Sequence, residues 1–335
     1  MSRSALIVAG ALFALGVLVW LLTMPPEDPV PPVVAPATPV IPPAVAVAPV
    51  DPGPLKSPPA ALEAAATGTP PRVTTRDELA RVLEARGLDA DRLIARYQDW
   101  RANRGFLGAD PLAGISPEDS LSSVYTAMDR TTQKSLADSG DLGAIQAYAA
   151  GSLPHDPFTA IEYYRRASEL GSAAAMAGLA GVLADIGAAP SSDFKNDKSF
   201  ADRLLALRGG DPARDLRLDS VAWTLASIRQ YGPVLATSAN LELAEGLGRS
   251  PDKEMLAAIC GQSLAILGAL SAATSGKDTS ALPPVFITEK GLYDRLPCRD
   301  TPAPVTPPRT LGACTASPAI GNNNQPVELW ICPEN

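Results

Sequence analysis

Residues 140–186 have the sequence GDLGAIQAYAAGSLPHDPFTAIEYYRRASELGSAAAMAGLAGVLADI, which carries the most regular helical pattern of the chain. Two openings of the same form occur in it, Gly140–Ala144 (GDLGA) and Gly171–Ala175 (GSAAA). They lie 31 residues apart, a spacing typical of repeated helical hairpins. The stretch therefore predicts three consecutive helices, the third beginning in the same way as the first, within an all-α body.

Small side chains recur along these expected helices, and small side chains allow two helix backbones to approach closely. Larger apolar residues between them supply the remaining contacts. One hairpin alone cannot bury both of its faces, so neighbouring hairpins must stack on it. The small residues are Ala144, Ala147, Ala167, Ala175 and Gly178, and the larger ones are Ile161, Tyr164, Met176, Leu179 and Leu183.

A family resemblance rests on one unit of this stretch. Gly140-Asp141, a small-residue helix over 144–151 and Asp156-Pro157 are followed by AIEYYRRASELG, residues 160–171. This unit resembles one repeat of the Sel-one-like branch of the tetratricopeptide-type repeats. In that pattern an aspartate leads a second helix that carries an alanine, an aromatic pair, a basic residue, another alanine and a closing glycine.

A second unit is interrupted. Residues 172–186 resemble the first helix of another repeat, and residues 219–232 resemble its partner helix. The sequence departs from the family between them, at 187–218, where a long insertion replaces a short turn and predicts its own helix near 200–207. The resemblance implies a solenoid of stacked hairpins that presents a curved surface to a protein partner, with no catalysis of its own.

Capping signals predict further helices before this stretch. Thr75–Glu78 is a capping box, in which Thr75 and Glu78 satisfy each other's backbone amides, and that helix ends at Gly87. Asp89 opens the next helix. Its buried face is expected to hold Leu93, Tyr97 and Trp100, with Arg92, Arg96 and Arg101 largely off it.

Local sequence signals place four more helices around the central stretch. Ser116-Pro117 is expected to start one, with proline at the first helical position. A short one follows over 132–138. After the repeats, residues 241–247 and 255–267 continue the helical pattern. The expected buried residues are Leu121, Val124, Tyr125 and Met128 in the first of these helices, and Met255, Ile259 and Ile266 in the last.

The N-terminus carries twenty residues without a charge, Ala5–Met24. That length matches the roughly 30 Å hydrocarbon core of a membrane. Arg3 precedes the segment and acidic residues follow it, so the N-terminus is expected in the cytoplasm and the rest of the chain outside it. The segment lacks a small-residue cleavage site, which favours an uncleaved anchor in an inner membrane over a cleaved signal peptide.

The next segment, Pro25–Pro71, is rich in proline, valine and alanine. Frequent prolines exclude helix and sheet, so an extended linker is expected, serving either as a spacer that holds the body away from the membrane or as a plain tether. The expected organisation is an anchor at 1–24, a linker at 25–72, a helical repeat domain at 73–276 and an irregular C-terminal extension at 277–335.

The extension contains two strand-like runs, 285–287 and 327–331, which predict at most one short antiparallel pair packed on the last helices. All four cysteines, Cys260, Cys298, Cys314 and Cys332, lie in the part expected outside the cytoplasm. None is in a C-x-x-C motif, so no metal site is expected. Two disulfides are favoured over buried thiols, with Cys314 joined to Cys298 or Cys332 and the remaining tail cysteine to Cys260.

Catalytic chemistry has little support. The one histidine, His155, is expected to be an exposed turn residue rather than part of a triad. The carboxylate pairs Asp156 with Glu162 and Glu242 with Glu245 are explained by capping and solvated faces. The loop Arg208–Asp211 lacks the residues of a phosphate loop and is expected to be a plain turn. No enzyme activity, metal or cofactor is expected.

Partner binding is the expected role. The net charge of −8 argues against nucleic acid, which requires a concentrated basic surface. One of Tyr163 and Tyr164 is expected in the core and the other in contact with a partner, so Tyr163, Glu162 and Arg166 are the candidate binding residues. We expect a periplasmic scaffold for a protein or peptide. The alternatives are a carboxylate-using enzyme, a protein that binds cell-wall glycan, and an architectural component that contacts its own copies.

Overall fold

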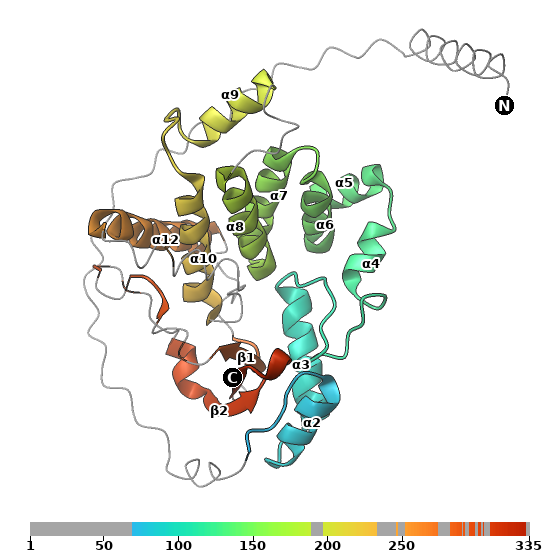
Figure 1. Cartoon of the computed structure of the whole chain (residues 1–335). Helices are drawn as coiled ribbons and strands as arrows, with labels where there is room; N and C mark the ends of the chain where they lie inside the picture. Colours follow the sequence, from blue (N-terminus) through green and yellow to red (C-terminus); the bar gives the residue numbers. More distant parts are fainter. Residues whose placement is uncertain are drawn as a thin grey trace, which may run out of the picture. The chain divides into compact units, whose positions relative to one another are not determined.

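The computed structural model describes ten segments of the chain, and every structural statement below concerns these residues (Figure 1). All of them belong to one compact unit. The expected membrane anchor, the linker up to Gly68 and most of the expected helix 241–247 lie outside them. The described segments are 69–188, 197–232, 246, 252–273, 282–289, 291, 295–298, 301–302 with 304, and 309–332.

Helices make up most of the described chain, as predicted (Figure 1). Each predicted helix from Asp89 onward that falls within it is present, although most bounds shift by one to three residues. The helices are α2 (Arg76–Glu84), α3 (Ala90–Asn103), α4 (Leu121–Thr126), α5 (Arg130–Asp138), α6 (Leu142–Ser152), α7 (Pro157–Glu169), α8 (Ala173–Ala188), α9 (Lys198–Leu207), α10 (Leu216–Tyr231) and α12 (Lys253–Ala273).

Aspartates begin most of these helices. In each case the carboxylate accepts a hydrogen bond from a backbone N–H of the first turn, which would otherwise have no partner. These caps are local in sequence, which explains why so many helix starts were predictable. The capping aspartates are Asp89, Asp129, Asp141, Asp156, Asp197 and Asp215.

The predicted capping box of α2 is only half formed. The hydroxyl of Thr75 accepts from the backbone N–H of Glu78 at 3.3 Å, as expected. The carboxylate of Glu78 does not return to Thr75. It accepts instead from the backbone N–H of Thr74 at 2.8 Å and from the hydroxyl of Thr74.

Consecutive helices pack on one another from α5 to α10, as Figure 1 shows. Helix α5 contacts α6, α6 contacts α7, α7 contacts α8, and α8 pairs with α10 across the insertion that carries α9. The pairing of α8 with α10 is the one predicted for the interrupted unit. The small residues Ala144, Ala167 and Ala175 are fully buried between these helices, together with Ile145 and Leu179.

The expected third helix is wrong in its start and in its buried face. Pro117 lies in a turn, in which Ser116 Oγ accepts from the backbone N–H of Asp119, and α4 begins only at Leu121. Leu121 and Val124, expected to be buried, are 46% and 52% exposed. A six-residue helix is too short to bury a stripe over two turns, and only Tyr125 and Met128 are half-buried.

The C-terminal extension is more ordered than predicted. It contains β1 (Val285–Glu289), β2 (Thr315–Ile320) and β3 (Pro326–Ile331) in an antiparallel sheet of order β1-β3-β2. The predicted pair is β1 with β3, in which Phe286 lies opposite Trp330. The strand β2 was not predicted, and it makes β3 the central strand. Short 3₁₀ helices occupy Arg309–Ala313 and Asn322–Asn324.

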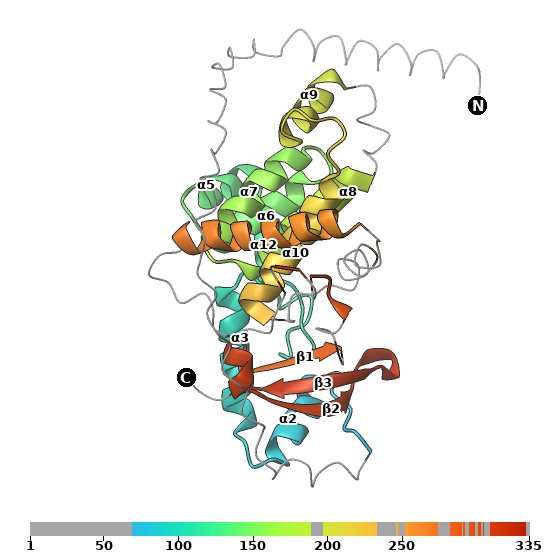
Figure 2. The same ribbon diagram turned by 90° about the vertical axis from the view of Figure 1, so that its left-hand side faces the viewer.

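The strands form their core with the first two helices (Figure 2), whereas the extension was expected to pack on the last helices. Within the described residues that expectation holds for Leu296 and Cys298, which pack against α10 and α12. Val285, Ala319 and Leu329 share a core cluster with residues of α2 and α3, among them Leu83 and Ile94. The backbone N–H of Val73 also donates to Ile320 O at 2.9 Å, and that of Ile320 donates to Pro71 O at 2.8 Å. The two ends of the described chain therefore close on each other.

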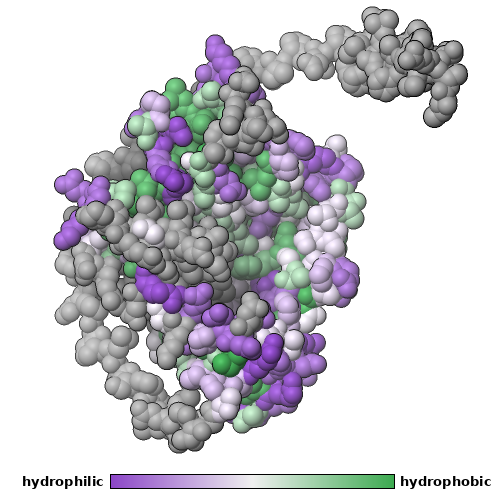
Figure 3. All heavy atoms as spheres, viewed as in Figure 1, coloured by the Kyte–Doolittle hydropathy of each residue, from purple (hydrophilic) through white to green (hydrophobic). Residues whose placement is uncertain are grey.

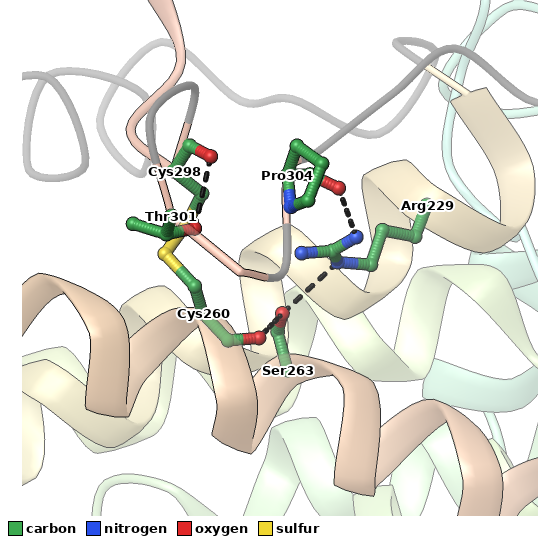
Figure 4. The surroundings of a disulfide bond; sticks show 6 residues. All are labelled: Arg229, Cys260, Ser263, Cys298, Thr301 and Pro304. Carbon is green, nitrogen blue, oxygen red and sulfur yellow. Dashed lines mark hydrogen bonds between the residues drawn. A yellow bond between two sulfur atoms is a disulfide. The ribbon is translucent and has the colours of Figure 1, made fainter. Parts of the chain in front are cut away.

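Both predicted disulfides are present. Cys314 joins Cys332, with a Cα–Cα distance of 4.1 Å, and Cys260 joins Cys298, at 5.8 Å. The second bridge ties α12 to the segment after β1, as Figure 4 shows. Beside it Arg229 donates to Ser263 Oγ at 3.0 Å and to the carbonyl oxygen of Pro304 at 2.6 Å. Of the two pairings left open by the sequence, the structure has the one that joins Cys314 to Cys332.

Within the described residues, one helix is long and apolar enough by composition to cross a membrane, namely α12. Its position is not the N-terminal one that the sequence predicts for an anchor. A hydrogen bond and a covalent bond hold this helix to the rest of the unit. Gln262 Nε2 donates to Asp219 Oδ1 at 2.6 Å, and Cys260 is joined to Cys298 by the disulfide. These bonds favour a helix packed along α10.

Candidate functional site

The predicted binding residues lie where α7 crosses the end of α5. The hydroxyl of Tyr163 donates to Asp138 Oδ1 at 2.8 Å, and Arg166 Nη2 donates to the carbonyl oxygen of Asp138 at 2.9 Å. Tyr163 is only 8% exposed, and its ring centroid lies 4.7 Å from that of Tyr148. Tyr163 and Tyr164 are both buried, so the expectation that only one belongs to the core is wrong.

Asp138 is the centre of this contact. Its other carboxylate oxygen accepts from Lys134 Nζ at 2.7 Å. The hydrogen bonds from Lys134 and from Tyr163 lower the pKa of Asp138 below its ordinary value of 3.8. The carboxylate thus stays ionised and fixes α7 against α5.

The outer face of α7 is charged and accessible. Glu162, Arg165 and Glu169 are exposed, at positions i, i+3 and i+7 of the helix, and Arg166 is half-buried beside them. The part of the predicted site that a partner can reach is therefore Glu162 with its charged neighbours. The partner-binding role of these residues stays a prediction.

A second place on the molecule was not predicted. A groove of about 840 Å³ opens between the segment after α3 and the helices α4, α5 and α6. Apolar side chains form much of its lining, including Phe106, Met128 and Tyr164. In Figure 3 the right-hand side of the molecule, where Figure 1 places α4 and α5, carries white, green and purple areas side by side.

One wall of the groove is the segment 105–109, which a buried ion pair holds in place. Arg101 pairs with Asp110, and Arg101 Nη2 also donates to the carbonyl oxygen of Gly108 at 2.8 Å. The hydroxyl of Tyr97 donates to Asp110 Oδ2 at 2.9 Å, and burial raises the pKa of Tyr97. Arg101 was expected off the buried face of α3, and its 8% exposure makes that expectation wrong.

Gln146 lies at the end of the groove beside Gly105. Its side chain is on α6 and is 7% exposed, and its Nε2 is buried without a hydrogen-bond partner. Gly105 has a φ of +77°, and a Cβ there would clash with the Gln146 amide. The glycine is needed both for the backbone conformation and for the close approach of the glutamine.

Arg130 is the first residue of α5, and its side chain lies beside Gly151 near the end of α6. Its guanidinium is 3.7 Å from the ring centroid of Tyr148, and it donates to Ser152 Oγ. A Cβ on Gly151 would lie 2.5 Å from Arg130 Nη1, so the absence of a side chain at Gly151 makes room for this cation. Among the described residues no carboxylate pairs with Arg130, and none lines the groove.

The remaining candidates have structural roles. His155 is an exposed turn residue. Asp156 caps α7 and pairs with Arg203 at 3.0 Å. Gly209 and Gly210 form a turn with φ values of +69° and +82°. The pair Glu242 and Glu245 lies outside the described residues, within which no group of three or more His, Cys, Asp or Glu side chains is placed to hold a metal ion.

Sequence reasoning missed the groove because its members come from five segments that no local pattern connects. One signal was present, because Gln146 is the only amide side chain in LGAIQAYAA, the otherwise apolar stretch that makes up most of α6. A polar residue in such a position requires a partner or costs stability.

No family model, curated protein or solved structure matches the chain. Its function is therefore argued from the contacts and charges described above.

Proposed function

We propose that this chain is a membrane-anchored, exported scaffold that binds a protein partner on an array of Sel-one-like helical hairpins. The observation that carries the proposal is the recurrence of one local geometry. Gly140 and Gly171 have φ values of +95° and +91°. The residue after each, Asp141 or Ser172, then accepts from the backbone N–H three positions on, at 2.7 and 3.0 Å.

The pairing of the helices that follow Gly140 and Gly171 also supports the proposal of repeated helical hairpins. Helix α6 pairs with α7, and α8 pairs with α10. Each second helix, α7 or α10, begins at a capping aspartate. The insertion with α9 lengthens the second unit without separating its two helices. Stacked hairpins of this kind form an extended surface, and holding other chains is the use to which such surfaces are suited.

The exported location has separate support. Disulfides form and persist in oxidising compartments, and all four cysteines of this chain are paired. The uncharged N-terminal segment, preceded by Arg3, supports an inner-membrane anchor with the described unit in the periplasm. The exported location and the inner-membrane anchor are both part of the proposal.

The proposed contact surface is the outer face of α7, with Glu162, Arg165, Arg166 and Glu169. Alternating charges on one exposed helix face are typical of the polar rim of a protein–protein interface. Charged contacts there set the specificity of the partner and its rate of association. Tyr163 lies beneath this face and fixes it through Asp138. Its own contact with a partner is limited to the small part of the ring that is exposed.

Cross-linking in intact cells tests this proposal. A photo-reactive residue at position 162 or 165 of the full chain should capture one defined partner. The same residue at Asp202, an exposed position on α9, serves as the matched control. The substitutions Glu162→Lys and Arg165→Glu should abolish a capture made from position 169. The assignment fails if position 202 captures the same species, or if both charge reversals leave the capture unchanged.

A further inference from the structure

The groove beside α6 has features that the scaffold role leaves unexplained. Gln146 is the clearest of them. A buried amide that makes no hydrogen bond destabilises the folded chain relative to one that is satisfied. An apolar residue of the same size would fill the position without this cost. The retention of a glutamine that faces the groove is explained if a bound molecule supplies the missing acceptor.

The second feature is a cation in an otherwise acidic chain. The net charge is −8, yet the charged side chains that line the groove are Arg101 and Arg130. Arg101 is neutralised by Asp110. Arg130 is an exposed residue held by the Tyr148 ring and by hydroxyl and amide oxygens, and no carboxylate of the described residues pairs with it. The groove is therefore complementary to an anion.

The third feature is that both groups line one groove, with an apolar lining between other polar groups. Gln146 is on α6, and the Arg130 guanidinium, from α5, lies over Gly151 near the end of α6. Ala147 and Ala150 of α6 present only methyl groups to the groove. Phe106, Met128 and Tyr164 add further apolar lining.

We propose that this groove binds a small organic anion with an apolar body, whose charged group meets Arg130 and whose acceptor oxygen meets the Gln146 amide. The volume of about 840 Å³ is within the range of ordinary small-molecule sites. The site is separate from the outer face of α7 and goes beyond the scaffold role. Either conclusion can fail without the other.

Three related probes test the proposal on the full chain in detergent, by calorimetric titration against a micelle blank. The first is hydroxynaphthalene sulfonate, with its hydroxyl on the ring far from the sulfonate. The second is naphthalene sulfonate, which lacks the hydroxyl. The third is hydroxynaphthalene sulfonamide, which lacks the charge. The first should bind most tightly, because it alone offers both groups.

Two substitutions should separate the two contacts. Gln146→Leu should weaken the hydroxyl-bearing sulfonate about tenfold and leave naphthalene sulfonate unchanged. Arg130→Gln should weaken both sulfonates and leave the sulfonamide unchanged. Arg81→Gln, which removes an exposed arginine of α2 outside both the groove and the outer face of α7, is the matched control and should change none of the three. Gln146→Leu should also raise the midpoint of thermal unfolding, which a purely structural glutamine would not do.

A third substitution blocks the groove itself. A Cβ on Gly108 meets nothing within 4 Å, so Gly108→Trp can extend into the groove without strain and should abolish binding of all three probes. If that variant does not fold, Ala150→Leu fills the same space from α6. The proposal is overturned if no probe binds above the micelle blank. It is also overturned if a folded blocking variant binds as the wild type does, or if Gln146→Leu weakens both sulfonates equally.

Discussion

At the scale of single residues, the pair Arg101 and Asp110 shows what a helical pattern cannot reveal. The sequence places Arg101 at the edge of the apolar face of α3, where arginine is ordinarily solvated. Its partner comes from a turn nine residues later, which folds back and buries both groups. Only the path of that turn, which periodicity does not encode, distinguishes a buried ion pair from a surface arginine.

Asp110→Asn should therefore destabilise the protein strongly. The substitution removes the charge that compensates Arg101, and a buried, uncompensated charge costs about 3–5 kcal/mol. Asp91→Asn is the matched control, because Asp91 pairs with Arg76 at 3.1 Å while 89% of its side chain is exposed. Exposed pairs contribute about 0–1 kcal/mol. Urea unfolding of both variants measures the difference, and equal effects would contradict the role given to Asp110.

Asp138 gives a prediction about pH. Its pKa is lowered by hydrogen bonds from Lys134 and Tyr163, so its ionised form favours the folded state. That contribution is fully present above the ordinary value of 3.8 and is lost as pH falls through the lowered pKa. The difference in unfolding free energy between the wild type and Asp138→Asn should be constant above about pH 5 and should shrink below about pH 4. Urea unfolding at a series of pH values measures it, and a difference that grows on acidification would reverse the assignment.

At the scale of elements, the helices α5 to α8 were predictable because their signals are local. A capping aspartate or serine and a small-residue pattern lie within each segment or directly before it. The strand β2 lacked such a signal. Its sequence TASPAI contains Pro318, which cannot donate to a sheet and normally argues against a strand. Because β2 is at the edge of the sheet, the proline is tolerated, and only the tertiary fold reveals this.

The two disulfides should differ in how much they stabilise the fold. The Cys260–Cys298 bridge spans 38 residues of sequence and joins α12 to a segment with little regular structure. The Cys314–Cys332 bridge spans 18 residues and joins strands that are already paired, since Thr315 lies opposite Ile331. The longer bridge restricts the unfolded chain more, so its removal should be the more damaging one.

We expect the double variant Cys260→Ala with Cys298→Ala to lose about 2–4 kcal/mol of stability, and Cys314→Ala with Cys332→Ala to lose less. Denaturant unfolding of the two variants under oxidising conditions provides the comparison. Peptide mapping without reduction should find the same two pairs in the wild type. A Cys298–Cys314 peptide would contradict the pairing described here.

At the scale of the whole described unit, the sheet and the first helices form one cooperative region although they are distant in sequence. Leu329 on the central strand is fully buried in the cluster that contains Leu79 and Leu83 of α2. The prediction that the C-terminal extension packs on the last helices holds for Leu296 and Cys298 but is wrong for the strands, and the reason is physical. An amphipathic strand specifies that one face is buried, but it does not specify which distant helices cover that face.

Leu329→Ala should therefore destabilise α2 and α3 more than it destabilises the helices from α5 to α10. Truncation of a buried leucine costs about 2–5 kcal/mol, and the cavity it leaves adjoins these two helices and not α6 or α7. Hydrogen exchange followed by peptide should show faster exchange in residues 76–103, with little change in residues 142–169. Leu264→Ala on α12 is the control, because Leu264 is 43% exposed and should alter neither region. Equal acceleration across both regions would contradict this prediction. It would show that the sheet, α2 and α3 unfold together with α6 and α7 as one unit.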